Sequence, residues 1–479
     1  MERLEKILVL NSDEIAKIHD NSMKILEKTG IHVNSEIVLK NASELGLSVN
    51  RDTKIVRFPR NIVLDCLESL PSKINLYSSN GSLTAELGHG KTYAASGHNA
   101  IFVLDWDAAE RRNATKEDIG KFALLADYLP NFNIVSPEAF PQDVKASASI
   151  LHAADALLQN TQKHIFISPG RAEEIKPIYD MVKIAIDNNN LGEKPPITCQ
   201  LSPTPPLSWE KGQIEALFET VKQGVPLCVL PEPFAGVTSP YTIAGHLTIH
   251  NAEVLSGIVF SQLIKKGSSV IYGSGWTSFD MRTINVLIGS PETVLMRLAG
   301  SQMADFYHIP YHTIAPDTDA HVMDEQLAWE KFATAWSAYL SQADLIVNGG
   351  MLGTGLTVSF EQLVIDNELL SYIKRISRGI KIDDDTLALA AIEKIGPKGN
   401  FLSDDHTLKF LGSGEHWEPE ISVREQYENW KKNGMKDIIH KAHEKVQSIL
   451  KTHNSVGLSE QKTNAIKAVI RIFENSCLL

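Results

Sequence analysis

The chain has 479 residues, of which 43% are hydrophobic and 22% charged, a composition typical of a folded globular protein. Its formal net charge of −12 at pH 7 argues against binding to nucleic acid or to an anionic membrane surface. The four cysteines are scattered, and no run of about 18 apolar residues occurs. We therefore expect a cytoplasmic enzyme without disulfides, structural zinc or a membrane span.

The first 113 residues predict an N-terminal elaboration that is helical at first and then rich in β-strands. Residues 12–26 begin with an N-cap residue followed by two acids, Ser12-Asp13-Glu14, and their apolar side chains have a roughly helical spacing. Four short β-rich runs follow between about residues 54 and 105: IVRFP, INLYSS, KTYAAS and NAIFVLDW. The glycines between these runs predict hairpin-type turns.

Residues 114–380 alternate short apolar runs with amphipathic segments, which predicts an α/β chain folded as a (β/α)8 TIM barrel. A doubly wound nucleotide fold is disfavoured because no G-x-G-x-x-G follows the first strand. The eighth strand is not placed; the other seven are expected at 133–136, 164–168, 197–201, 226–230, 269–272, 311–315 and 345–348. Helices are expected at 146–159, 172–187, 210–223, 251–265, 291–306 and 325–340. Residues 381–479 predict a helical C-terminal extension for packing or oligomer contact.

A barrel enzyme carries its chemistry in the loops after the carboxyl ends of its strands. In this chain those loops supply many acids and aromatic side chains but one close cation, Arg282. Such a mouth suits a cation, and aromatic faces hold a quaternary ammonium ion in particular. Arg282 or a protonated histidine would then bind a carboxylate at the ligand's other end. The other residues expected at the mouth are Tyr93, Phe102, Trp106, Glu138, Glu232, Tyr272, Trp276, Asp280 and Phe360.

The sixth and seventh of these loops each have a second interpretation. The sixth, HTIAPDTDAHVMDEQ, has side chains of metal-ligand type, but their spacing differs from that of a helical H-E-x-x-H site, so no metal is expected. Asp324 in this loop is better explained as a helix cap. The seventh, NGGMLGTG, resembles a phosphate cradle but contains no lysine or arginine. A barrel enzyme acting on a phosphorylated metabolite is therefore one alternative.

Several long segments resemble one family, the trimethylamine methyltransferases, and the resemblance runs over about residues 12–450. They are SGHNAIFVLDWDAAERRNATKEDI, VTSPYTIAGHLTIHNAEVLSGIV, GSPETVLMRLAGSQMADFYHIP, MDEQLAWEKF, MLGTGLTVSFEQLVIDNELL and RGIKIDDDTLALAAIEKIGPKGNFLSDDHTLKF. The resemblance implies a (β/α)8 barrel that moves a methyl group from a methylated amine to the cobalt of a separate corrinoid protein. The cobalamin would be carried by that partner and not bound permanently to this chain.

The trimethylamine enzymes of this family carry pyrrolysine, whereas this chain contains only the twenty standard residues. It therefore resembles the non-pyrrolysine branch, which includes glycine betaine:corrinoid protein methyltransferase. A quaternary nitrogen is already charged and leaves as a neutral amine, so the protein must supply positioning and electrostatics. Two residues depart from the family pattern: His321 stands where many members have lysine, and Glu232 where a neutral residue is expected.

These departures leave the reaction class in place and the quaternary amine open. Glycine betaine is the first candidate, followed by proline betaine, carnitine, γ-butyrobetaine and choline-like cations. Tyr93, His98, Asp319 and His321 are expected to position the methyl group. Substrate binding is expected from Glu232, Tyr272, Trp276, Asp280, Arg282, His312, Asp317, Asn348, Met351 and Phe360. We also expect a homo-oligomer; a quaternary-amine-binding protein without turnover is the second alternative.

Overall fold

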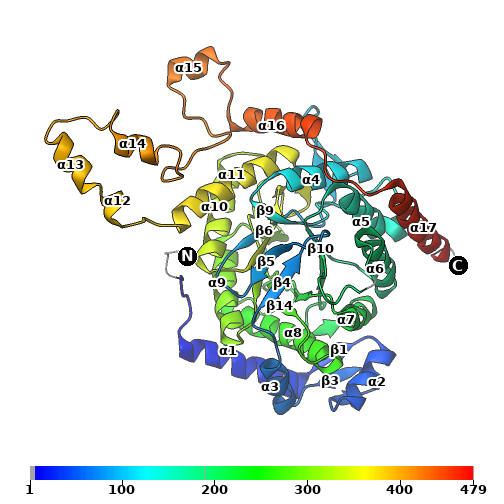
Figure 1. Ribbon diagram of the computed structural model, residues 1–479. Coiled ribbons are helices and arrows are strands. Elements are labelled where there is room, and N and C mark those ends of the chain that lie inside the picture. Colours follow the sequence, from blue (N-terminus) through cyan, green and yellow to red (C-terminus); the bar gives the residue numbers. More distant parts are fainter. Residues whose placement is uncertain (1–5, 189, 478–479) are drawn as a thin grey trace.

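A closed barrel of eight parallel strands forms the centre of the chain, as the computed structural model shows for residues 6–188 and 190–477 (Figure 1). The predicted (β/α)8 barrel is confirmed. Around the barrel the strand order is β10-β11-β13-β14-β17-β18-β6-β9. The strands are β6 (Tyr93–Ser96), β9 (Phe132–Val135), β10 (His164–Ile167), β11 (Ile197–Leu201), β13 (Leu227–Val229), β14 (Val270–Ser274), β17 (Tyr311–Ile314) and β18 (Leu345–Gly349).

The eighth strand is β6, which lies in the segment KTYAAS and pairs with β18 and β9. The expected start of the barrel at residue 114 is therefore too late, because the barrel begins at Tyr93. Two features explain why the sequence pattern does not predict this strand. All four of its residues are buried, so it has no alternating pattern, and a β-hairpin rather than a helix precedes it.

Eight helices surround the barrel and pack their apolar sides against its strands. They are α4 (Lys116–Tyr128), α5 (Ser149–Asn160), α6 (Ala172–Ile186), α7 (Lys211–Gln223), α8 (Ile243–Ile264), α9 (Pro291–Phe306), α10 (Glu325–Leu340) and α11 (Phe360–Ser377). The predicted bounds of α9 and α10 agree with the structure, whereas α8 begins eight residues before the predicted residue 251. Because α8 is buried on nearly all sides, it lacks the amphipathic stripe that marks a helix start.

The N-terminal segment covers α8 and closes the amino end of the barrel. Its elements are α1 (Ser12–Lys24), a π-helical turn (Ile25–Thr29), β1 (Ile31–Val33), α2 (Glu36–Glu44), β2 (Ser48–Asn50), β3 (Ile55–Arg57), α3 (Arg60–Glu68), β4 (Ile74–Tyr77) and β5 (Leu83–Leu87). The β4–β5 hairpin buries Ile74 and Leu87 against Tyr93, Ile134 and Phe166 inside the barrel. This end of the barrel is thus filled with apolar side chains, which leaves the other end for chemistry.

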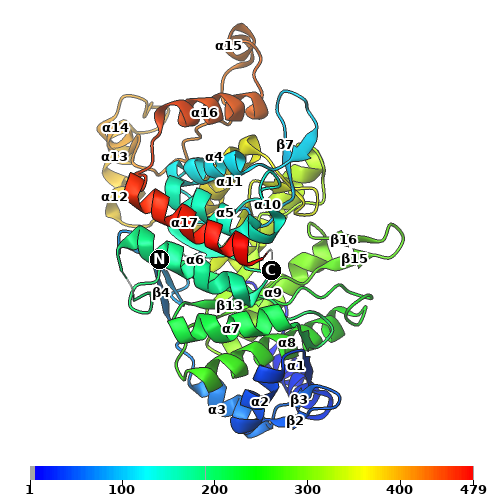
Figure 2. The ribbon, with the colours of Figure 1, turned by 90° about the vertical axis from the view of Figure 1, so that its right-hand side faces the viewer.

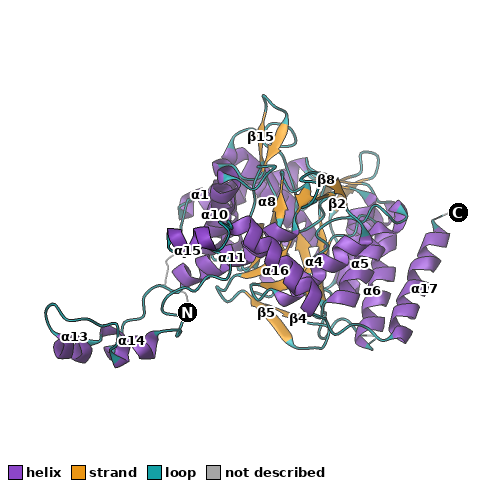
Figure 3. Cartoon of the chain, turned by 90° about the horizontal axis from the view of Figure 1, so that it is seen from above, coloured by secondary structure: helices purple, strands orange, loops and turns teal. Residues whose placement is uncertain are grey.

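Two small sheets rise at the carboxyl ends of the strands. One contains β7 (Phe102–Leu104), β8 (Arg111–Asn113), β19 (Met351–Leu352) and β20 (Thr357–Val358). The other is a hairpin of β15 (Ser278–Asp280) and β16 (Asn285–Leu287), which projects from the body in Figures 2 and 3. A short strand, β12 (Ser208–Trp209), joins the N-terminal sheet instead.

The C-terminal extension is helical, as predicted, and only part of it packs on the barrel. It consists of α12 (Asp384–Leu387), α13 (Leu389–Ile395), α14 (Asp405–Phe410), α15 (Tyr427–Lys432), α16 (Ile438–Thr452) and α17 (Glu460–Ser476). α16 lies on α11 and α4, and α17 lies on α6 and α5. In the described part of the chain, no helix has the length and apolar character needed to cross a membrane.

Candidate functional site

A cavity of about 520 Å³ lies at the mouth of the barrel, where the strands end. Inward side chains of the strands and of the residues directly after them, such as Gln200, Leu230, Ile314 and Val347, line its inner part. Of the predicted site residues, the structure brings His98, Glu232, His321, Asn348 and Met351 to this cavity. The other lining residues are Asn99, Phe234, Gly275, Thr277, Ile284, Asn285, Val286, Ile288, Gly353, Thr354, Gly355 and Leu356.

Glu232 supplies the acidic side chain of this cavity, directly after β13. Gly275 makes room for it, since a Cβ on that glycine would come within 2.8 Å of the Glu232 Cγ. The Glu232 side chain is exposed within the cavity, and the protein packed around it desolvates the carboxyl group, which raises its pKa to about 7. Near neutral pH the group therefore populates both its neutral and its charged form, and a bound cation would favour the charged one.

His98 stands at the head of a column of rings inside the barrel. Its Nε2 lies 2.7 Å from the Ser168 Oγ, and its backbone N–H donates to the Met351 Sδ at 3.1 Å. The Phe166 ring lies 5.3 Å from the ring of His98 and stacks at 5.4 Å on that of His312. Burial lowers the pKa of both histidines to about 3. Both rings are therefore neutral, and His312, deeper in the barrel, does not line the cavity.

Asp319 does not reach the cavity, contrary to its predicted role in positioning the methyl group. Its two carboxylate oxygens accept hydrogen bonds from the backbone N–H groups of Ile288 at 2.8 Å and Gly289 at 3.1 Å. Desolvation raises the pKa of Asp319 above its usual value. The carboxylate thus ties the sixth loop to the segment after β16, while His321, two residues later, lines the cavity.

The glycine-rich seventh loop is held by hydrogen bonds to its neighbours. The Gly353 N–H donates to the Ala320 carbonyl at 2.8 Å, and the Thr354 N–H donates to the Thr318 carbonyl at 3.1 Å. The Gly350 N–H donates to a carboxylate oxygen of Asp366. Because these three amides already have acceptors, they are not available to cradle a phosphate.

Asp317 lies behind the cavity in a buried ion pair with Arg297 of α9, at 2.6 Å. Its other oxygen accepts a hydrogen bond from the Asn348 Nδ2, also at 2.6 Å. Asn348 lines the cavity and has a φ of 135°, a region that L-residues rarely adopt. Asp317 therefore holds a cavity residue in place rather than touching the cavity itself.

Two aromatic residues expected to contact substrate are instead buried between the barrel and its helices. The Tyr272 hydroxyl donates to the Asn251 Oδ1 of α8 at 3.0 Å. The Trp276 ring lies 3.7 Å from that of His250, also on α8. Both side chains are completely buried, so the predicted aromatic wall of the cavity does not form at these positions.

The remaining predicted mouth residues also lie elsewhere. Phe360 stacks on Phe122 at 4.1 Å between α11 and α4, and Trp106 stacks on a histidine of α16 at 4.1 Å. Phe102 lies in β7 under the guanidinium of an arginine from β8, and Tyr93 faces the closed amino end of the barrel. Glu138 is fully buried, and burial raises its pKa to about 8.

Asp280 and Arg282 lie on the projecting β15–β16 hairpin, outside the cavity lining. The Arg282 backbone N–H donates to the Asp280 Oδ1 at 2.8 Å, and its Nε lies 3.3 Å from the same oxygen. The Arg282 side chain is 91% exposed. The pair therefore shapes the hairpin turn, and Arg282, predicted to bind a substrate carboxylate, lies outside the lining of the cavity.

Arg282→Gln is accordingly expected to leave both stability and turnover nearly unchanged. The melting temperature should stay within about 2 °C, because exposed ion pairs contribute little. KM values measured for glycine betaine and for a quaternary amine without a carboxylate should also stay the same. A KM increase confined to glycine betaine would bring Arg282 back into the site.

Several lining residues were not predicted, although their loops were. Phe234 follows Glu232 by two residues in PEPFAGVTSP, and Gln200 lies on β11 just before the proline-dense loop. Asn285 and Ile284 come from the β15–β16 hairpin, which projects beside the mouth and borders the cavity with these residues. Phe234 and Gln200 lie at the ends of predicted strands, and this position could have marked them as cavity residues. The sequence pattern does not predict the β15–β16 hairpin, so nothing in it marks Asn285 and Ile284 as cavity residues.

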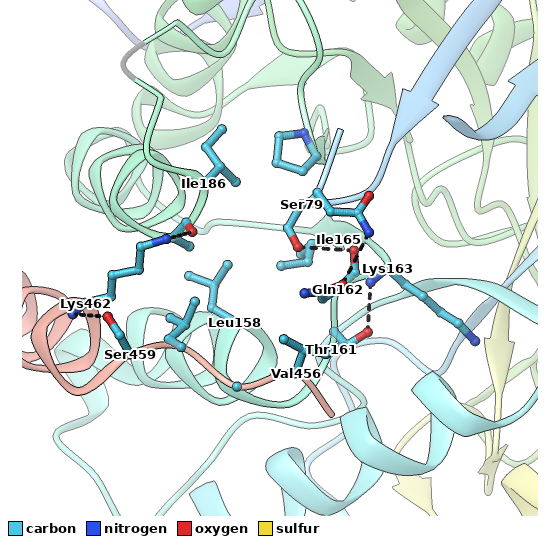
Figure 4. A pocket seen from close by; sticks show the side chains of 15 residues that line it. Ser79, Leu158, Thr161, Gln162, Lys163, Ile165, Ile186, Val456, Ser459 and Lys462 are labelled. Atoms are coloured by element: carbon cyan, nitrogen blue, oxygen red, sulfur yellow. Dashed lines mark hydrogen bonds between the residues drawn. The ribbon is translucent and has the colours of Figure 1, made fainter. Parts of the chain in front are cut away.

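A second cavity, of about 300 Å³, lies where residues 456–462 pass α5 and α6 (Figure 4). Its polar groups already have partners: the Lys163 Nζ donates to three backbone carbonyls between residues 126 and 132. The Ser79 N–H donates to the Gln162 carbonyl, and the Lys462 Nζ donates to the Ala185 carbonyl. We therefore interpret this cavity as a gap left where the C-terminal segment packs against α5 and α6. Among the described residues, no group of three or more His, Cys, Asp and Glu could hold a metal ion.

Comparisons with known proteins agree over nearly the whole length. The model of the family described as trimethylamine methyltransferase (MTTB) matches residues 1–475. A trimethylamine methyltransferase of Desulfitobacterium hafniense is 31% identical over 466 residues, which cover 97% of this chain and 94% of that protein. A glycine betaine methyltransferase of the same species is 30% identical over 473 residues, with 98% and 97% covered.

Among solved structures, the monomethylamine methyltransferase of Methanosarcina barkeri is similar at 12% identity and a TM-score of 0.47, covering 94% of this chain and 96% of that one. Family membership rests on the sequence matches. Because the family model spans nearly all residues, the protein belongs to the trimethylamine methyltransferase (MTTB) family.

Proposed function

We propose that this protein transfers a methyl group from a quaternary amine to the Co(I) centre of a separate corrinoid protein. The observation that carries the proposal is the acid Glu232 in an otherwise largely neutral cavity at the barrel mouth. Among the described residues that line the cavity there is no lysine or arginine. A ligand with one positive charge suits such a lining, because Glu232 would ionise beside it.

The transfer needs little proton chemistry from the chain. The C–N bond breaks with its electron pair left on nitrogen, so a neutral tertiary amine departs. The methyl carbon forms a bond to cobalt with two electrons that the metal supplies, which takes Co(I) to Co(III). The cavity residues bind and orient the ammonium ion so that one methyl group points out of the mouth. Neutral side chains such as His98 and Met351 suit this task.

The exposed apolar side chains around the mouth support docking of a macromolecule there. Ile284 is 75% exposed and Leu356 is 44% exposed, and both also line the cavity. Val237, Tyr241 and Met281 are also exposed, on the neighbouring loop and hairpin. Exposed apolar patches of this kind mark protein–protein contact sites. The corrinoid protein must dock at this opening, because its cobalt has to reach the substrate through it.

Glycine betaine remains the first substrate to test, as the 30% identical D. hafniense enzyme carries that name. In this cavity its carboxylate would depend on neutral donors such as Asn99, Asn285 and Thr354. Carnitine, proline betaine and γ-butyrobetaine carry the same two charges, whereas choline-like cations carry one. The lack of pyrrolysine favours quaternary over tertiary amines.

The deciding experiment is incubation of the protein with a reduced corrinoid protein and a panel of amines. Methylation of the corrinoid, followed optically, is expected with at least one quaternary amine and not with trimethylamine. Methylation by trimethylamine alone would refute the proposal. Tight binding of a quaternary amine without methylation by any tested corrinoid partner would favour the binding-protein alternative.

A further inference from the structure

The charges of the cavity at the barrel mouth are of one sign. Glu232 carries a negative charge when it ionises, and the part of the lining that the structure describes contains no lysine or arginine. His98 is neutral there, because burial lowers its pKa to about 3. Behind the cavity, the guanidinium of Arg297 is buried and already paired with Asp317. Among the described lining residues, His321 alone could therefore become a charged partner for an anionic group of a ligand near neutral pH, and only in its protonated form.

The side of the mouth opposite Glu232 carries neutral polar groups. Glu232 follows β13, whereas His98 and Asn99 follow β6, and these two strands lie four places apart in either direction around the eight-stranded barrel. A ligand whose ammonium group lies beside Glu232 can therefore direct its other end toward His98 and Asn99. The Asn99 Oδ1 and the His98 Nδ1 are buried and have no hydrogen-bond partner among the described residues.

Both of these atoms suit a ligand that donates a hydrogen bond. The Oδ1 of Asn99 is an amide oxygen and can only accept. The Nδ1 of His98 is an acceptor as well in the tautomer whose Nε2–H donates to the Ser168 Oγ, 2.7 Å away. A hydroxyl group donates its hydrogen and stays neutral, whereas a carboxylate has only acceptors. A buried acceptor without a donor costs free energy, so a hydroxyl group at this end of the ligand stabilises the complex more than a carboxylate does.

We propose that the quaternary amine used by this protein is a monocation whose other end carries a hydroxyl group, as choline does, and not a betaine with a carboxylate. This inference rests on the proposed methyl transfer and names its substrate class. In that step the C–N bond breaks with its electron pair left on nitrogen, so choline departs as neutral 2-(dimethylamino)ethanol. The methyl carbon bonds to cobalt, which goes from Co(I) to Co(III), and no proton has to move.

The charges of the ligands separate the two classes in the same direction. An ionised Glu232 attracts the ammonium group of either ligand but repels the carboxylate of a betaine, which lies a few ångströms away on the same molecule. That carboxylate would also lose water without gaining a lysine or arginine partner in the described lining. Outside the cavity, the net charge of −12 attracts a cation, whereas a zwitterion has no net charge to be steered.

Methylation of a reduced corrinoid protein at pH 8 tests this proposal with three amines of similar size: choline, glycine betaine and the primary amide of glycine betaine. The amide keeps the shape of the betaine and removes its negative charge. At pH 8 Glu232 is mostly charged, and unperturbed histidines are neutral. We expect kcat/KM to be at least tenfold higher for choline and for the amide than for glycine betaine. A value for glycine betaine equal to or above that for choline would overturn the proposal.

His321→Asn is the matched variant, because it removes the described lining side chain that can become a cation near neutral pH. The preference for choline over glycine betaine should stay the same. A loss of activity confined to glycine betaine would place a carboxylate at His321 and contradict the proposal.

Calorimetric titration without the corrinoid protein makes the ligand class independent of turnover, and the dissociation constants should follow the same order. If this order holds but no amine methylates the corrinoid protein, the proposed function fails and the ligand class stands. Methylation by glycine betaine alone would instead refute the ligand class and leave the proposed function intact.

Discussion

Replacement of Glu232 by glutamine is expected to weaken binding of the quaternary ammonium substrate by roughly tenfold to a hundredfold at pH 8. A quaternary ammonium ion has no N–H donor, so Glu232 attracts it through charge alone, which is worth about 1–4 kcal/mol at 4 Å between bulk water and a protein surface. Glutamine preserves the shape of the side chain while removing its charge. Calorimetric titration with the amine that proves active measures this directly. The control is Glu219→Gln, which neutralises an exposed glutamate on α7 and should leave binding unchanged.

The same residue sets the pH dependence of binding. The pKa of Glu232 is raised to about 7, so the carboxylate is mostly protonated at pH 6 and mostly charged at pH 8. A cation prefers the charged form, and its affinity should therefore rise by about tenfold between these two pH values. Binding below pH 7 should also release a proton, which calorimetry in buffers of different ionisation enthalpy detects. In the glutamine variant both effects should vanish; an unchanged pH profile there would remove Glu232 as the cation's partner.

The sequence pattern was sufficient for the fold because seven of the strands alternate with helices of ordinary length. The bounds of α9 and α10 were clear because Ser290 and Asp324 cap these helices at their N-termini. The strand β6 is not predicted as a barrel strand because it is short, wholly buried and joined to a hairpin. Because the prediction does not include β6, it places the start of the barrel at residue 114 instead of Tyr93.

The site was harder to predict than the fold, and strand parity explains much of the difference. All residues of β14 are buried, so its sequence does not show which side chains face inward. Tyr272 faces the helices, whereas its neighbours Ile271 and Gly273 face the barrel interior. The sequence also does not show which acids of the polar loops face the cavity: Asp319 accepts hydrogen bonds from backbone amides, whereas Glu232 borders the cavity. Both are acids that follow strands, and only the packing of the loops separates them.

Breaking the ion pair between Arg297 and Asp317 is expected to produce the largest loss of stability. The two side chains are 1% and 0% exposed, so removing one partner leaves a charge without a counterion in the protein interior. Arg297→Met or Asp317→Asn should each lower the free energy of unfolding by about 3–5 kcal/mol. Urea denaturation measures the change. Asp280→Asn, which breaks the exposed pair with Arg282, is the matched control and should leave the midpoint unchanged.

The double variant tests whether the two charges act as a pair. With both charges removed no isolated ion remains, so Arg297→Met combined with Asp317→Asn should cost clearly less than the two single losses added together. Additive losses would mean that each residue stabilises the fold through separate contacts. Asp317→Leu should also lower kcat/KM more than Arg297→Met does, because leucine has no oxygen to accept the hydrogen bond from the Asn348 Nδ2. Asn348 keeps its φ of 135° only while its surroundings hold it, so its release changes the wall of the cavity even where the barrel stays folded.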